Sequence, residues 1–127
     1  MKFEYNEENI THVMQLIRNN LTSDLIKQKH RDQNKRNPMY GHCKHASEAL
    51  VELMNTDQLC LMKSKTHVWV QDGSKIYDIT VDQYHSMGLN PSYNGQSYSD
   101  MRMSIKTKEL VDRVLRTSST SGTEGGS

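Results

Sequence analysis

The sequence predicts an α+β fold in which helices pack on a small antiparallel sheet. Apolar residues recur every three or four positions over residues 7–21 and 42–54, which is the spacing of amphipathic helices. Between residues 66 and 80, two runs rich in β-branched and aromatic residues flank Asp72-Gly73, a pair typical of hairpin turns. We therefore expect helices first, a central helix, at least three antiparallel strands and a terminal helix.

The length of 127 residues predicts one domain, which we place at residues 1–116. A net charge of +1 gives no global attraction to nucleic acid, and a hydrophobic content of 34% predicts a small core. Residues 117–127 are Thr, Ser, Gly and a single Glu, a composition typical of a flexible tail or linker.

The sequence carries no recognisable signal peptide and no apolar stretch long enough to span a bilayer. Its two cysteines, Cys43 and Cys60, lack the spacing of a disulfide framework and are expected to be free thiols in a reducing compartment. We therefore expect a cytoplasmic protein without a membrane partner.

The first helix begins near Glu7 and Glu8, where acidic side chains favour a helix N-terminus. A second, short helix is expected around Thr22-Ser23-Asp24, with Leu25 and Ile26 turned inward. The apolar positions that define the first helix are Ile10, Val13, Met14, Ile17 and Leu21.

A basic stretch follows and ends at the breaker Asn37-Pro38. The simplest interpretation is a solvated helix end and loop. The alternative is a basic lip that attracts an acidic or phosphate-bearing substrate, and nucleic acid is a possible but not favoured partner. The basic residues are Lys27, Lys29, Arg31, Lys35 and Arg36.

The central helix is expected over residues 42–54, with an apolar stripe that extends back to Cys43. Cys43 therefore points toward the interior or a cleft. The stripe consists of Ala46, Ala49, Leu50, Leu53 and Met54.

Three further elements complete the predicted domain. Leu59-Cys60-Leu61-Met62 is expected to be a buried strand with Cys60 as inert core, and residues 86–99 a long loop that serves as a lid or substrate wall. Thr107 is expected to cap the last helix, whose inward residues are Leu110, Val111, Val114 and Leu115.

A two-residue hairpin loop at Asp72-Gly73 pairs His67 with Asp78 across the ladder, whereas a three-residue loop would separate them. Alternation favours the first register. It places Val68, Val70, Tyr77 and Ile79 on an apolar face and His67, Trp69, Asp78 and Thr80 on the other.

This pairing suggests thiol chemistry. A helix N-terminus and an imidazolium both stabilise a thiolate, so Cys43 is the candidate nucleophile, His67 the base and Asp78 its orienter. The Cys43 N–H would donate to an oxyanion. For a second donor the sequence leaves Asn37, Tyr40 and Gln83 open, and the expected substrate-binding residues are Tyr40, Trp69 and Gln83. Trp69 either shields the His–Asp pair from water, forms a substrate wall or belongs to the core.

Three segments resemble the papain-like and transglutaminase-like cysteine enzymes, including small bacterial and phage proteins. They are Gly41-His42-Cys43, His67-Val68-Trp69-Val70 and Asp78-Ile79-Thr80, within residues 40–84. The resemblance implies a Cys at the start of a central helix packed on a sheet, with His and Asp on successive strands. The papain oxyanion glutamine is absent, because Asn37 stands six residues before Cys43.

The expected function is acyl transfer or hydrolysis at an amide, thioester or isopeptide bond through a Cys43 acyl-enzyme, on a peptide, protein or small-molecule substrate. No cofactor or metal is required. The first alternative is a non-catalytic binding or inhibitor protein on a degenerate fold of this kind, acting on a host protein or nucleic acid. A zinc site is less favoured because no ligand-spacing motif is present. Residues of suitable ligand type are His42, Cys43, His45, Cys60, His67, Asp78 and His85.

Overall fold

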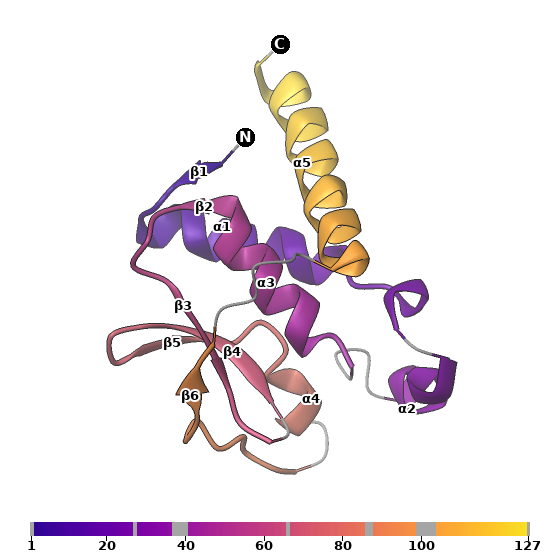
Figure 1. Cartoon of the computed structure of the whole chain (residues 1–127). Helices are drawn as coiled ribbons and strands as arrows, with labels where there is room; N and C mark the ends of the chain where they lie inside the picture. The colour runs from indigo at the N-terminus through magenta and orange to yellow at the C-terminus, as the bar shows by residue number, and fades with distance from the viewer. Residues whose placement is uncertain are drawn as a thin grey trace.

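The computed structural model describes residues 2–26, 28–36, 41–65, 67–85, 88–98 and 104–126. It confirms a mixed α and β architecture with a small antiparallel sheet (Figure 1). In chain order the elements are β1 (Phe3–Glu4), α1 (Glu7–Asn19), η1 (Ser23–Leu25), η2 (Gln28–His30), α2 (Arg31–Arg36), α3 (Cys43–Leu53), β2 (Met54–Asn55), β3 (Cys60–Lys63), β4 (Val68–Asp72), β5 (Lys75–Tyr77), α4 (Asp82–His85), β6 (Gln96–Ser97) and α5 (Ile105–Gly126).

Helix α3 lies at the centre of the molecule, between the helices α1 and α5 on one side and the sheet on the other (Figure 1). Its apolar stripe is buried as expected, and Ala46 and Ala49 let the neighbouring elements approach closely. The core joins this stripe to residues of α1, the hairpin and α5, including Ile10, Ile17, Val70, Tyr77, Leu110 and Val114.

Helix α1 begins where the sequence predicts. The Asn6 side chain caps it by accepting a hydrogen bond from the Asn9 N–H at 2.8 Å, and Glu7 and Glu8 occupy the first turn. The short helix that follows is the 3₁₀ turn η1, which buries Leu25, and Ile26 directly after it is buried as well.

The four-stranded sheet has the order β5-β4-β3-β6, with antiparallel neighbours throughout. A separate two-stranded parallel pair joins β1 to β2. The segment expected to be a loop over residues 86–99 thus contributes an edge strand, β6, beside β3.

The expected hairpin register is wrong by two residues. Asp72 pairs with Lys75, so the loop is Gly73-Ser74 rather than Asp72-Gly73. Gly73 has φ of +58°, which suits the first central position of a type II′ turn. Because two residues are one full period of the pleat, the faces are as predicted, and Val70 lies opposite Tyr77 on the core side.

Cys60 is exposed, which corrects its expected place in the core. It is the first residue of β3, and the burial in this run falls on the preceding Leu59. Its thiol therefore meets solvent.

The cap of α5 is Ser104 rather than Thr107. Ser104 Oγ accepts a hydrogen bond from the Thr107 N–H at 3.1 Å, while the buried Thr107 hydroxyl donates to Glu48 Oε1 at 2.6 Å. Thr107 instead ties α5 to α3.

Helix α5 continues through residues 117–126, and Thr117 Oγ1 donates to the Arg113 carbonyl at 2.8 Å. The domain boundary after residue 116 stays a prediction. Within the described ranges, no helix combines the length and apolarity needed to cross a bilayer.

Candidate active site

The centre of the candidate site is a buried pair between His67 and Asp78. His67 Nε2 lies 2.7 Å from Asp78 Oδ2, and the two residues are 2% and 8% exposed. His67 directly precedes β4 and Asp78 directly follows β5, so the shifted register makes them diagonal rather than opposed neighbours. Diagonal positions on one face remain within reach of long or aromatic side chains. The predicted contact between His67 and Asp78 is therefore present, although the strands that carry these residues pair in a different register.

Tyr93 is a third member of this cluster that the sequence did not indicate. Its hydroxyl donates to Asp78 Oδ2 at 2.8 Å, so one carboxylate oxygen accepts from both Tyr93 and His67. Burial, followed by the bond to Asp78, raises the pKa of Tyr93. Tyr93 thus remains a donor through the physiological range.

Aromatic rings enclose His67. The Trp69 ring is stacked on it with centroids 5.8 Å apart, and the Tyr84 ring meets it edge-on at 4.9 Å. Trp69 is fully buried and also contacts the Tyr93 ring at 5.3 Å. These rings lower the local dielectric, which strengthens the His–Asp interaction.

Cys43 is the first residue of α3 and is half-buried. Burial lowers the pKa of His67, but Asp78 and then Cys43 raise it through side-chain hydrogen bonding and charge, and the net value is about 9. His67 Nδ1 is buried and forms no hydrogen bond of regular geometry with the described part of the chain. Since Asp78 takes Nε2, Nδ1 is the nitrogen left for the thiol.

Hydrogen bonds join the elements that carry these three residues. Ser47 Oγ donates to the Val68 carbonyl at 3.2 Å, which docks α3 on the strand that follows His67. An Arg18 guanidinium nitrogen donates to the Ile79 carbonyl at 2.9 Å, next to Asp78. Gly41 has φ of +84°, and this left-handed residue leads the chain into α3.

A scan against models of protein families, a search of curated proteins and a search of solved structures each found no match to this chain.

The expected substrate-binding residues lie in different places. Tyr40 and Asn37 are outside the described residues. Gln83 is buried and its Nε2 donates to Thr80 Oγ1 at 3.0 Å, while Trp69 lies behind His67 without surface exposure. The position of Trp69 fits the shielding role rather than a substrate wall.

The zinc alternative receives no geometric support. Within the part of the chain that the structure describes, no three of the His, Cys, Asp and Glu side chains form a group able to hold a metal ion. His42 and His45 instead bond to each other through Nδ1 and Nε2 at 2.7 Å.

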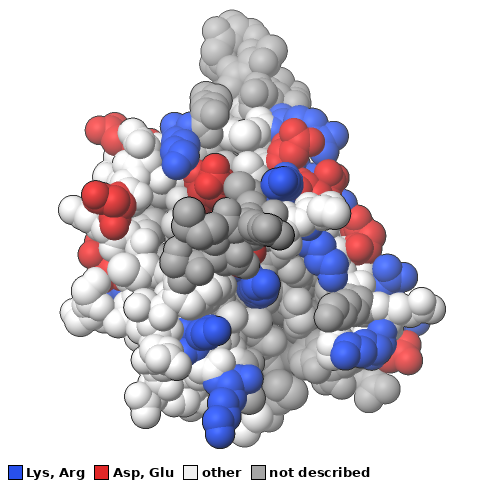
Figure 2. Space-filling model, viewed as in Figure 1, with Lys and Arg blue, Asp and Glu red and all other residues white. Residues whose placement is uncertain are grey.

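Acidic as well as basic side chains lie in and around the basic stretch. Lys29, Arg31 and Lys35 are exposed, and Lys35 pairs with Asp32 at 3.8 Å. Figure 2 shows acidic and basic side chains intermixed over α2 and the beginning of α5. A mixed surface of this kind does not provide the single-sign field that nucleic-acid binding uses.

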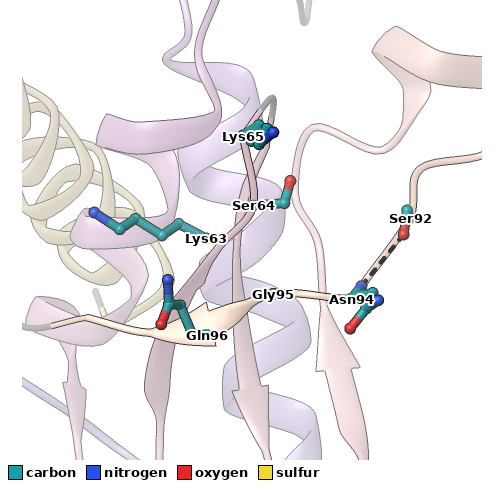
Figure 3. Close-up of a pocket in the computed structure, with 7 residues that line it drawn as sticks. All are labelled: Lys63, Ser64, Lys65, Ser92, Asn94, Gly95 and Gln96. Atoms are coloured by element: carbon teal, nitrogen blue, oxygen red, sulfur yellow. Dashed lines mark hydrogen bonds between the residues drawn. The ribbon is translucent and has the colours of Figure 1, made fainter.

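An open hollow of about 680 Å³ lies at the end of β3, beside the loop that carries Tyr93. Figure 3 shows Lys63 extending to one side of it while Ser92 and Asn94 lie on the other, joined by a bond from Asn94 N to Ser92 Oγ at 3.4 Å. Its polar groups do not converge, and none of the three candidate catalytic residues lines it.

Proposed function

We propose that this protein is a thiol enzyme that transfers or hydrolyses acyl groups through a covalent intermediate on Cys43. His67 serves as base and then acid, and Asp78 holds and charges the imidazole. The observation that carries the proposal is the buried His67–Asp78 pair at 2.7 Å, and Cys43, at the start of α3, contributes to the raised pKa of the same ring.

In the proposed reaction, the Cys43 thiolate attacks the carbonyl carbon of an amide, thioester or isopeptide bond. A C–S bond forms, and the electron pair of the carbonyl moves to oxygen, where the Cys43 N–H at the start of α3 can donate to it. The tetrahedral species collapses, and the leaving group takes the proton of the His67 imidazolium. The product of this half-reaction is the Cys43 thioester.

In the second half, His67 removes a proton from water or another nucleophile, which attacks the thioester carbonyl. The C–S bond breaks and the thiolate returns to Cys43. Asp78 keeps Nε2 engaged throughout, so Nδ1 alone exchanges the proton with substrate. A raised His67 pKa supports this scheme, because the thiolate needs a protonated imidazole beside it at neutral pH.

The chain contains its own control for a test, since Cys60 is a second free cysteine and is exposed. The pH dependence of iodoacetamide alkylation should be measured at both cysteines in one sample by peptide mass spectrometry. We expect Cys43 to be alkylated rapidly and stoichiometrically near pH 6, where Cys60 reacts much more slowly. In His67→Ala, this difference between the two cysteines should disappear.

Covalent catalysis is tested separately with p-nitrophenyl acetate. We expect an acetyl adduct on Cys43 and none in Cys43→Ala, with turnover of the adduct lost in His67→Ala. Parallel alkaline profiles for the two cysteines, together with no adduct on Cys43, would show that the fold carries no thiol activity and would favour the binding protein.

A further inference from the structure

Tyr93 and His67 share a single oxygen of the Asp78 carboxylate. The Tyr93 hydroxyl donates to Oδ2 at 2.8 Å, and His67 Nε2 lies 2.7 Å from the same atom. The other oxygen, Oδ1, is buried and has no hydrogen-bond partner among the described residues, which is a costly arrangement. A bond that served only to hold the segment in place would have been as strong on Oδ1. The two donors therefore compete for the negative charge of one atom.

Packing around Tyr93 holds its hydroxyl on Oδ2. The Tyr93 ring meets the fully buried Trp69 ring at 5.3 Å and an interplanar angle of 72°, and Gln96, three residues further on, pairs with Lys63 of β3. Burial, and then the bond to Asp78, raise the pKa of Tyr93, so its hydroxyl keeps the proton that it donates. The competition at Oδ2 thus persists throughout the physiological pH range.

The effect of this competition on His67 has a definite sign. A hydrogen bond from a neutral donor spreads the charge of a carboxylate and makes it a weaker base. Burial lowers the pKa of His67, and Asp78 is the first of the groups that raise it. Tyr93 therefore opposes part of the effect of Asp78, and the imidazolium is a stronger acid than it would be beside an Asp78 that it did not share.

The other titratable groups against the His67 ring come from two helices. Cys43 at the start of α3 also raises the pKa of His67, and Tyr84 of α4 meets the ring edge-on at 4.9 Å. Both act at the ring itself, whereas the hydrogen bond of Tyr93 is made to the carboxylate. The influence of Tyr93 can therefore be measured with the thiol removed.

We propose that Tyr93 is a positioning residue whose hydrogen bond to Asp78 Oδ2 makes the His67 imidazolium a better proton donor. The catalytic consequence rests on the proposed thiol function. When the bond between the acyl carbon and the leaving atom breaks, its electron pair stays on the leaving atom, which takes the proton of His67 Nδ1 and leaves the imidazole neutral. Tyr93 thus matters most for leaving groups that depart slowly without a proton, such as amines and alcohols.

The first experiment follows the titration of His67 by NMR in Cys43→Ala protein, in which no thiol contributes. Adding Tyr93→Phe removes the donor, keeps the ring and should raise the pKa of His67 by about 0.5–1. Inserting 3-fluorotyrosine at position 93 retains the fold and strengthens the donor, so it should lower that pKa. Tyr5→Phe removes a phenol that donates to another carboxylate, Asp72, and should leave it unchanged. A His67 pKa that is constant in both position-93 proteins, or that moves in the same direction, would overturn the proposal.

The second experiment measures single-turnover acylation of Cys43 by phenyl acetate and by p-nitrophenyl acetate. Phenolate is the poorer leaving group, so Tyr93→Phe should slow its reaction roughly threefold to tenfold and that of the nitrophenyl ester less than about twofold. Equal slowing of the two esters would reduce Tyr93 to a structural residue. A wild-type protein that neither ester acylates would refute the thiol function, while the titration of His67 would still decide whether Tyr93 acts through Asp78.

Discussion

Asp78 uses one carboxylate oxygen for two partners, which makes it the most constrained residue of the candidate site. Oδ2 accepts from His67 and from Tyr93, while Oδ1 is buried without a partner in the described part of the chain. The negative charge of a buried carboxylate is stabilised only while its hydrogen-bond donors stay in place.

The first prediction concerns the dependence of Asp78 on His67. Asp78→Asn should lower the rate of acyl transfer by about 10–10³-fold, and His67→Ala by about 10³–10⁴-fold, because only the latter removes the base. The double variant should resemble His67→Ala, since Asp78 acts through the imidazole. A double loss equal to the product of the single losses would assign Asp78 an independent role. The measurement is single-turnover acylation of Cys43.

The second prediction concerns Tyr93. Tyr93→Phe removes a hydrogen bond to a buried carboxylate and should lower the free energy of unfolding by about 1.5–3 kcal/mol, measured by urea denaturation. Acylation of Cys43 should slow as well. Tyr5→Phe is the matched control, because Tyr5 donates to Asp72 at the hairpin tip and its loss should leave the acylation rate unchanged.

At this scale the sequence predicted the contact between His67 and Asp78, which the structure contains, whereas the role of Cys43 stays a prediction. Nothing local pointed to Tyr93, which lies in an irregular segment and reaches Asp78 from fifteen positions away. Cys60 was misjudged for a related reason, since a short apolar run does not reveal which of its members begins the strand.

At the scale of elements, the segment before β6 packs against the sheet at Gly95. A Cβ there would overlap the Lys63 carbonyl oxygen and lie 2.7 Å from Trp69 Cη2. The Lys63 backbone cannot move aside to relieve this overlap as a flexible side chain could. The absence of a side chain therefore permits the close approach that brings Tyr93 to Asp78.

The third prediction follows from this approach. Gly95→Ala should destabilise the protein by about 1–3 kcal/mol, as overpacking does, and reduce the shielding of Trp69. Thermal unfolding and tryptophan fluorescence are the measurements. Gly73→Asn is the control, because its Cβ would meet nothing within 4 Å and Asn tolerates positive φ. A similar loss in both variants would contradict the steric explanation.

The hairpin shows what element patterns can and cannot predict. Alternation of apolar and polar residues determined which faces are buried, because burial enforces the period of two. It did not determine the register, since Asp72-Gly73 and Gly73-Ser74 both permit a two-residue loop. The capping of α5 likewise depended on a contact, between Thr107 and Glu48, that joins distant segments.

For the whole molecule, the buried histidines predict a maximum of stability near pH 6.5. The folded pKa of His67 is raised to about 9, so its stabilisation is full below 6.5 and is lost as the pH rises toward 9. The folded pKa values of His42 and His45 are lowered to about 4 and 3, so their stabilisation is full above 6.5 and is lost as the pH falls toward those values.

The fourth prediction is that single variants change the loss of stability at alkaline pH and the loss at acid pH independently. Thermal midpoints should be recorded from pH 4 to 9. Asp78→Asn should shift the alkaline decline to lower pH, and Cys43→Ala should shift it less, because Asp78 contributes more to the raised pKa of His67. His45→Gln should flatten the acid decline alone. An alkaline decline that is unchanged in Asp78→Asn would show that His67 is not its source.

The proton between His67 and Asp78 has one more property, which follows from the residues that cover it. It lies in a buried contact, with Tyr93 on the same oxygen and Trp69 and Tyr84 around the ring. Its exchange with water therefore requires a local opening that separates these side chains. Hydrogen exchange of this proton, followed by NMR, therefore reports how often that opening occurs. The ratio of the intrinsic to the observed exchange rate gives the free energy of the opening in the absence of substrate.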